Sequence, residues 1–146
     1  MSVLDVEVTS DRGRMDVDRV HAWLTNAYWS VGVPREVVER AMERSLFFAA
    51  FLGAVQIGFA RVVTDATTFA YVCDVIVDEA HRGKGVGKAL MTAVMAHADM
   101  QGLRRIGLVT LDAHRLYEPF GFSAIDRPER HMAIVRADPY RERPGA

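Results

Sequence analysis

Cysteine is nearly absent from this chain of 146 residues, which contains Cys73 alone. A lone cysteine cannot form an internal disulfide, and no second thiol stands near it to complete a metal site. We therefore expect Cys73 to be a small core residue, in a protein without a metal. Long apolar runs are also missing, since no stretch approaches the roughly 20 apolar residues that cross a bilayer. The polar first segment lacks the order of a signal peptide, so we expect a cytoplasmic protein without a membrane partner.

A large net charge is missing as well, because 18 lysines and arginines are balanced by 19 aspartates and glutamates. A nearly neutral chain has no extended field that attracts nucleic acid, so we expect no nucleic-acid partner. Any anion must then be bound by a local cluster of charges. Half of the residues are hydrophobic, which is enough for one ordinary domain to bury a core. We predict a single domain over residues 3–137, followed by a tail over residues 138–146.

The local cluster of charge lies in residues 75–90, which predict a strand, a glycine-rich turn and a helix. Three glycines at alternate positions let the backbone adopt conformations that other residues avoid and approach a ligand closely. Consecutive N–H groups can then point into one concavity, and the positive end of the helix adds further donors. The glycines and the basic residues around them are Arg82, Gly83, Lys84, Gly85, Gly87 and Lys88. This composition indicates a diphosphate site.

Two common phosphate-binding loops do not fit this spacing. A P-loop has Arg82 in place of its first glycine here, and Ala89 in place of its hydroxyl residue. The dinucleotide-binding fingerprint needs a third glycine where this chain has Lys88. The pattern Arg-x-x-Gly-x-Gly does fit, with Arg82, Gly85 and Gly87 directly after a strand. This pattern resembles the acyl-CoA pyrophosphate loop of the GCN5-related N-acetyltransferase (GNAT) superfamily.

A second segment resembles the same superfamily's Ala-x-x-x-Tyr-x-x-x-Gly-Phe motif, with Ala113, Tyr117, Gly121 and Phe122 in register. One expected helix and one expected strand separate the two motifs, and the resemblance spans at least residues 46–122. It implies an α/β fold with a central mixed, mostly antiparallel sheet of about six to seven strands and helices on both faces.

The resemblance also implies a splayed pair of strands at the cofactor site, where the pantetheine arm of coenzyme A pairs with exposed backbone. The backbone contacts are then expected from Val75, Ile76 and Val77. The diphosphate contacts are expected from Arg82, Gly83, Lys84, Gly85, Val86, Gly87 and Lys88.

Hydrophobic spacing along the chain predicts elements that agree with this architecture. In chain order, we expect strand 3–9, helices 17–27 and 34–44, strands 46–52, 55–63 and 67–77, helix 86–100, strand 106–111, a short helix capped by Asp112, and late strands 122–125 and 132–135.

The resemblance places Tyr117 beside the thioester sulfur, as the general acid toward the departing thiolate. A phenol has an ordinary pKa of about 10, so it is protonated at neutral pH. The general base that deprotonates the amine has four candidates, which are Asp74, Asp112, His114 and a chain of water molecules. Asp74 leads, because it lies in an apolar strand beside the expected cofactor, although it could equally be a structural acceptor. One position departs from the pattern, since Thr110 stands where many members have asparagine, and a hydroxyl replaces only part of an amide's hydrogen bonding.

The acceptor pocket is expected between the amino-terminal helices and the adjacent strands, where core packing would explain the same aromatic residues equally well. Its candidate residues are Tyr28, Trp29, Phe48 and Arg61.

We predict an acetyl-CoA-dependent N-acetyltransferase that acts on a primary amine of a small molecule by direct attack. A protein amine as the acceptor is one alternative, and a non-catalytic acyl-CoA sensor is another, against which Tyr117 argues. The sequence does not name the acceptor or the oligomeric state, for which a homodimer is one expectation.

Overall fold

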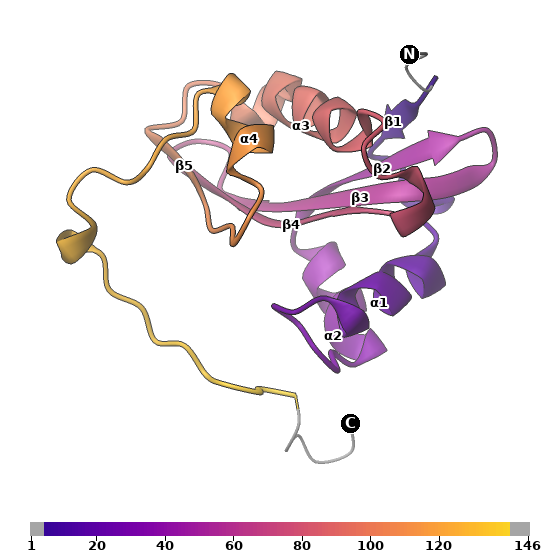
Figure 1. Cartoon of the computed structure of the whole chain (residues 1–146), viewed down its shortest axis with the longest axis horizontal. Coiled ribbons are helices and arrows are strands. Elements are labelled where there is room, and N and C mark those ends of the chain that lie inside the picture. The colour runs from indigo at the N-terminus through magenta and orange to yellow at the C-terminus, as the bar shows by residue number, and fades with distance from the viewer. Residues whose placement is uncertain (1–4, 141–146) are drawn as a thin grey trace.

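The computed structural model describes residues 5–140, which form a mixed five-stranded sheet with helices on both faces (Figure 1). The expected α/β class is therefore confirmed. In chain order, the strands and helices are β1 (Glu7–Thr9), α1 (Val17–Asn26), α2 (Arg35–Glu43), β2 (Leu46–Leu52), β3 (Val55–Thr64), β4 (Phe69–Val77), α3 (Val86–Ala96), β5 (Arg105–Leu108) and α4 (His114–Tyr117). None of the helices between residues 5 and 140 combines the length and apolarity needed to span a bilayer.

The sheet has its strands in sequence order, β1-β2-β3-β4-β5. Neighbours from β1 to β4 are antiparallel, whereas β4 and β5 are parallel because α3 crosses between them. Helices α3 and α4 cover one face, and α1 and α2 cover the other (Figure 1). The three expected strands within residues 46–77, the helix after the glycine-rich turn and the strand that follows this helix are all present, although the last of these strands ends at Leu108.

Each face of the sheet has its own apolar core. Alternation along β2 points Phe48 toward α3 and Phe47 toward α1 and α2, so the two rings belong to different clusters. Helix α3 packs closely on β3 at Gly58, where an added Cβ would come within 3.1 Å of both Val86 and Leu90. This contact fixes the first turn of α3, and therefore the loop before it, against the centre of the sheet.

The parallel pair splays apart, as expected. Pairing between β4 and β5 runs only from Phe69 to Val72 on β4 and from Arg105 to Leu108 on β5. Strand β4 continues to Val77, and over this stretch no other strand of the described residues lies on its β5 side. The result is a wedge bordered by exposed backbone of β4.

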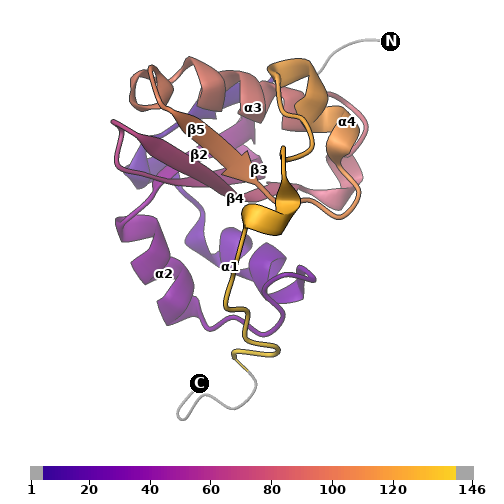
Figure 2. The ribbon, with the colours of Figure 1, turned by 90° about the vertical axis from the view of Figure 1, so that its left-hand side faces the viewer.

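The two late strands were predicted wrongly. Residues 122–125 and 132–135 pair with no strand, so the described sheet has five strands instead of six to seven. The second of these segments lies in an extended arm that leaves the sheet and runs toward α1 and α2 (Figure 2). A strand needs a neighbouring edge within hydrogen-bonding distance, and among residues 5–140 neither segment pairs with one. Residues 3 and 4 of the expected first strand fall outside the described residues.

Candidate active site

The glycine-rich turn connects β4 to α3. Gly83 and Gly85 have φ of +75° and +86°, in the left-handed region where a residue with a Cβ is strained. An added Cβ would meet nothing within 4 Å at either position, so conformation, and not lack of space, requires glycine there. Gly85 is also the N-cap of α3, which places the turn at the positive end of that helix.

This turn presents a row of unused donors. From Gly83 to Lys88, the backbone N–H groups make no hydrogen bond to any described residue. Arg82, Lys84 and Lys88 are exposed and form no salt bridge within residues 5–140. Free N–H groups at a helix start, surrounded by uncompensated cations, have the chemistry of an anion site. The donor set fits a diphosphate.

Asp78 ties the start of this turn to α1, a role that the sequence analysis missed. Its carboxylate accepts a hydrogen bond from Nδ1 of His81 at 2.9 Å and pairs with Arg19 of α1 at 3.2 Å. The hydrogen bond from His81 holds the pKa of the Asp78 carboxyl below its ordinary value. The spacing of three residues between Asp78 and His81 is the only local signal of this link.

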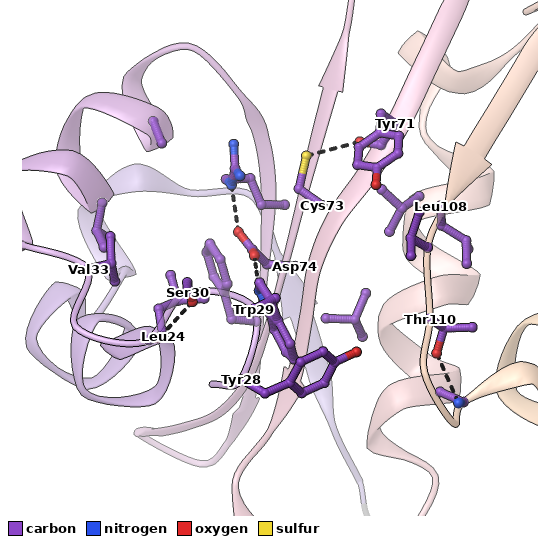
Figure 3. Close-up of a pocket in the computed structure, with 18 of the residues that line it drawn as sticks. Leu24, Tyr28, Trp29, Ser30, Val33, Tyr71, Cys73, Asp74, Leu108 and Thr110 are labelled. Atoms are coloured by element: carbon purple, nitrogen blue, oxygen red, sulfur yellow. Dashed lines mark hydrogen bonds and ion pairs between the residues drawn. The ribbon is translucent and has the colours of Figure 1, made fainter. Parts of the chain in front are cut away.

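A pocket of about 680 Å³ opens between the α1–α2 connection, the middle of the sheet and the segment before α4 (Figure 3). The side chains that carry the argument below are Tyr28, Trp29, Arg61, Cys73, Asp74 and Tyr117. Val75 also lines this pocket, so the pocket reaches the free edge of β4. The Val77 carbonyl, in contrast, accepts a hydrogen bond from Nε of Arg82 at 3.2 Å.

Asp74 is the centre of a polar network at the base of this pocket. It is 5% exposed, and its two oxygens accept hydrogen bonds from Nε1 of Trp29 and Nε of Arg61, each at 2.7 Å (Figure 3). Arg61 also donates to Oγ of Ser45 at 3.1 Å. Arg61 and Asp74 are cross-strand neighbours on β3 and β4, so the sheet register creates the ion pair. Three of the predicted site residues are thus brought together.

Tyr117 lies on the other side of the pocket, where α4 ends. It is 8% exposed, and its ring meets Phe122 edge to face with the centroids 5.9 Å apart. Burial, with a smaller contribution from Tyr28, raises the pKa of Tyr117 to about 12. The hydroxyl bonds to no other described residue. The pocket is therefore bordered by a phenol that stays protonated at neutral pH and has a free O–H.

Phe48 is not part of this pocket, which corrects its expected role. It is buried on the opposite face of the sheet, where it meets the ring of His97 edge to face.

Asp112 does not cap α4, because the N-cap is Ala113. The N–H of Ala113 donates to Oγ1 of Thr110 at 2.9 Å. Thr110, the residue that departs from the family pattern, therefore shapes the entry into α4.

Comparisons with known proteins agree with this geometry. Residues 17–122 match the model of the acetyltransferase (GNAT) family. A solved structure from Xanthomonas campestris, described as a candidate acetyltransferase of that family, is 42% identical, covers 96% of this chain and 99% of its own, and has a TM-score of 0.92. A candidate acetyltransferase from Gibberella zeae is 26% identical over an alignment of 136 positions, which covers 77% of this chain and 76% of that protein. Another from Deinococcus radiodurans, at 21% identity with coverages of 96% and 94% and a TM-score of 0.70, shares the fold.

Proposed function

Since this chain belongs to the acetyltransferase (GNAT) family, we propose that it transfers the acetyl group of acetyl-CoA to a primary amine of a small molecule. One observation carries this proposal. The unused N–H groups of residues 83–88, the free edge of β4 and the protonated phenol of Tyr117 all adjoin the same wedge between β4 and β5. A donor bound along this wedge has its thioester directed at the pocket that contains Asp74.

The donor is acetyl-CoA, a substrate and not a resident cofactor. Its diphosphate is bound by the N–H groups from Gly83 to Lys88, and the three basic side chains around the turn add charge. Its pantetheine amides pair with the free edge of β4 along Val75, Ile76 and Val77, as an added strand would. Asp78 donates its N–H to the Ile57 carbonyl of β3, so alternation along β4 turns the N–H and C=O of Ile76 toward β3 and those of Val75 and Val77 toward the wedge. Because Arg82 uses the Val77 carbonyl, Val75 carries most of this pairing.

The acceptor occupies the pocket between Trp29 and Tyr117. Each carboxylate oxygen of Asp74 accepts one hydrogen bond from the protein, which leaves lone pairs for an ammonium group. Tyr28 and Trp29 meet edge to face at 5.0 Å and remain partly exposed, so they form an aromatic wall for the rest of the molecule. A small molecule with a primary amine on an apolar or aromatic frame can therefore bind the carboxylate through its ammonium group and pack its frame against the aromatic wall.

The reaction needs no covalent intermediate. Burial raises the pKa of the Cys73 thiol, and no histidine among residues 5–140 bonds to it, so Cys73 is a poor nucleophile. The amine nitrogen attacks the thioester carbonyl, the new C–N bond forms, and the C–S bond breaks. The amine's proton passes to Asp74, directly or through water, and Tyr117 donates a hydrogen bond to the departing thiolate.

The test is release of free thiol from acetyl-CoA, followed with a thiol-reactive dye across a panel of amines. Each amine is paired with its quaternary ammonium analogue, which keeps the charge but cannot be acylated. We expect release with certain primary amines, none with the analogues, and an acetylated product by mass spectrometry. If the protein binds coenzyme A but no amine accelerates thiol release, the proposed activity is wrong and a sensor role is favoured. Release with peptides alone would move the acceptor to protein amines.

A further inference from the structure

The C-terminal arm, residues 131–136, is an apolar segment left in solvent. Met132, Ile134 and Val135 are 97%, 86% and 84% exposed. From Met132 to Arg136, neither backbone nor side chains make a hydrogen bond to another described residue. Four successive apolar residues in extended conformation are typical of a strand that is buried on both faces. The arm thus has the composition of an interior strand but no sheet around it.

A groove that could hold an extended segment such as this arm runs along the outer edge of β5. It has a volume of about 990 Å³ and lies between β5 on one side and residues 122–127 on the other. Strand β5 pairs only with β4 in the described sheet, so its outer N–H and C=O groups have no strand partner. Val109, just beyond β5, is 81% exposed beside this groove. An open edge next to exposed apolar side chains is a template for an added strand.

The arm does not fill the groove of its own chain. After the turn at residues 128–130 it runs away from β5, and its far end is held by Tyr140, which packs against the core cluster of α1 and α2 (Figure 2). To enter its own groove, the arm would have to reverse at that turn and pull Tyr140 out of this contact. A second copy of the chain supplies the missing strand without either change.

We propose that two copies exchange arms, so that the arm of each copy enters the groove of the other and pairs with the outer edge of β5. Each copy has one arm and one groove, which is the self-complementary arrangement that closes a twofold dimer. The pairing satisfies the free edge of β5 and buries the apolar side chains of the arm together. This inference rests on the fold alone and does not depend on the proposed activity.

The exchange reaches the candidate active site. Ala133 and Val135 of the arm border the pocket that contains Asp74, and Tyr140 borders it as well. An arm held between β5 and residues 122–127 of the second copy forms a firmer wall than one lying in solvent. The acceptor pocket is then completed at the interface between the two copies.

The first test combines mass and hydrogen exchange on the full-length protein. Sedimentation equilibrium should give twice the 16.3 kDa of one chain, and the amides of residues 132–136 should exchange slowly. Dilution should release the dimer and the amide protection together. A mass of one chain at every concentration overturns the proposal, whether the arm is protected or not. A dimer whose arm exchanges as fast as an unfolded peptide overturns it too, because another surface must then form the contact.

The second test uses charge substitutions on the two sides of the contact. Ile134→Asp in the arm and Ile125→Asp in the groove should each weaken the dimer by about 30-fold or more, as at a buried interface residue. The matched control is Val55→Asp, because Val55 is 53% exposed in β3, next to the turn after β2 and away from both arm and groove. Circular dichroism checks that all three fold. An unchanged dimer in either of the first two variants contradicts arm exchange.

Discussion

Replacing Tyr117 with phenylalanine removes one oxygen atom and leaves the packing in place. The ring contact with Phe122 is kept, and the hydroxyl bonds to no other described residue. We therefore expect Tyr117→Phe to unfold at nearly the same temperature as the parent protein. Any loss of turnover then reports on the hydroxyl itself.

The size of that loss follows from the acidity of the phenol. With a pKa raised to about 12, Tyr117 is a weaker acid than a thiol, whose pKa is about 8.5. Complete proton transfer to the thiolate is therefore uphill, and Tyr117 acts by donating a hydrogen bond. A hydrogen bond to a charged group contributes about 1.5–3 kcal/mol. Removing it should lower kcat by about 10-fold to 150-fold.

The assay is amine-dependent thiol release, with the dissociation constant of coenzyme A measured by calorimetry. Tyr117→Phe should lower kcat while coenzyme A binds as before. The matched control is Tyr71→Phe, because Tyr71 lines the same pocket and burial also raises its pKa. This control should retain kcat, since Tyr71 lies on the paired part of β4, before the wedge opens.

The pH profile gives a second check. Because the pKa of Tyr117 is raised, its proton stays in place until the pH approaches about 12, so it contributes no fall in kcat between pH 7 and pH 10. Two outcomes refute the role of Tyr117 as hydrogen-bond donor to the thiolate. One is a variant with unchanged kcat, and the other is a variant that loses only affinity for coenzyme A, as a packing residue would.

Three further substitutions test the rest of the site and the fold. Gly85→Ala and the control Gly53→Ala both place a Cβ in open space at positive φ, so each should lose about 1 kcal/mol of stability. Only Gly85→Ala should also weaken coenzyme A binding, by up to about 10-fold in calorimetry, and equal affinities would contradict the diphosphate site. Asp74→Asn leaves the half-buried Arg61 without its charged partner and should cost about 3 kcal/mol by urea unfolding. Its activity relative to the parent should recover toward pH 10, where the amine is neutral without help, and a constant ratio would make Asp74 purely structural. Asp65 accepts hydrogen bonds from the hydroxyl and N–H groups of the turn after it, which lower its pKa. Because the folded-state pKa is depressed, Asp65 stabilises the fold at neutral pH and loses this effect below pH about 3.9. Asp65→Ala should therefore lower Tm at pH 7, and its difference from the parent should shrink in acid; a constant difference would argue against this linkage.

Local chemistry explains what the sequence predicted well. The positive φ values of Gly83 and Gly85 follow from the spacing of glycines after an apolar strand, which has few structural solutions. Helix α2 could be predicted from its apolar stripe, and its outer face carries the ion pair from Arg35 to Glu39 that this spacing predicts. Such features depend only on residues a few positions apart.

The pocket residues show where local information ends. Phe47 and Phe48 are equally apolar, and only the alternation of side chains between the two faces of the sheet decides which of them faces α1 and α2. The strand register shifts between Ala50 and Phe51 and again between Arg61 and Val62, and each shift changes which residues face each side. No residue type in the sequence indicates where these shifts occur. The bond from Trp29 to Asp74 joins residues 45 positions apart, so it depends on the packing of the α1–α2 connection on the sheet.

The late strands are a different kind of failure, because residues 132–135 have the apolar composition of a buried strand and yet form none. What a pattern specifies is a preference for being buried in a sheet, and it does not specify which chain supplies that sheet. Within one copy, the groove beside β5 and the exposed arm remain as two unmatched halves of the same contact. Arm exchange joins them and also brings Ala133 and Val135 into the wall of the acceptor pocket. In this arrangement the diphosphate site is formed by a turn within one chain, whereas the acceptor pocket is formed by two chains. A change in the sequence of the arm can therefore alter which amine binds without altering how the donor binds.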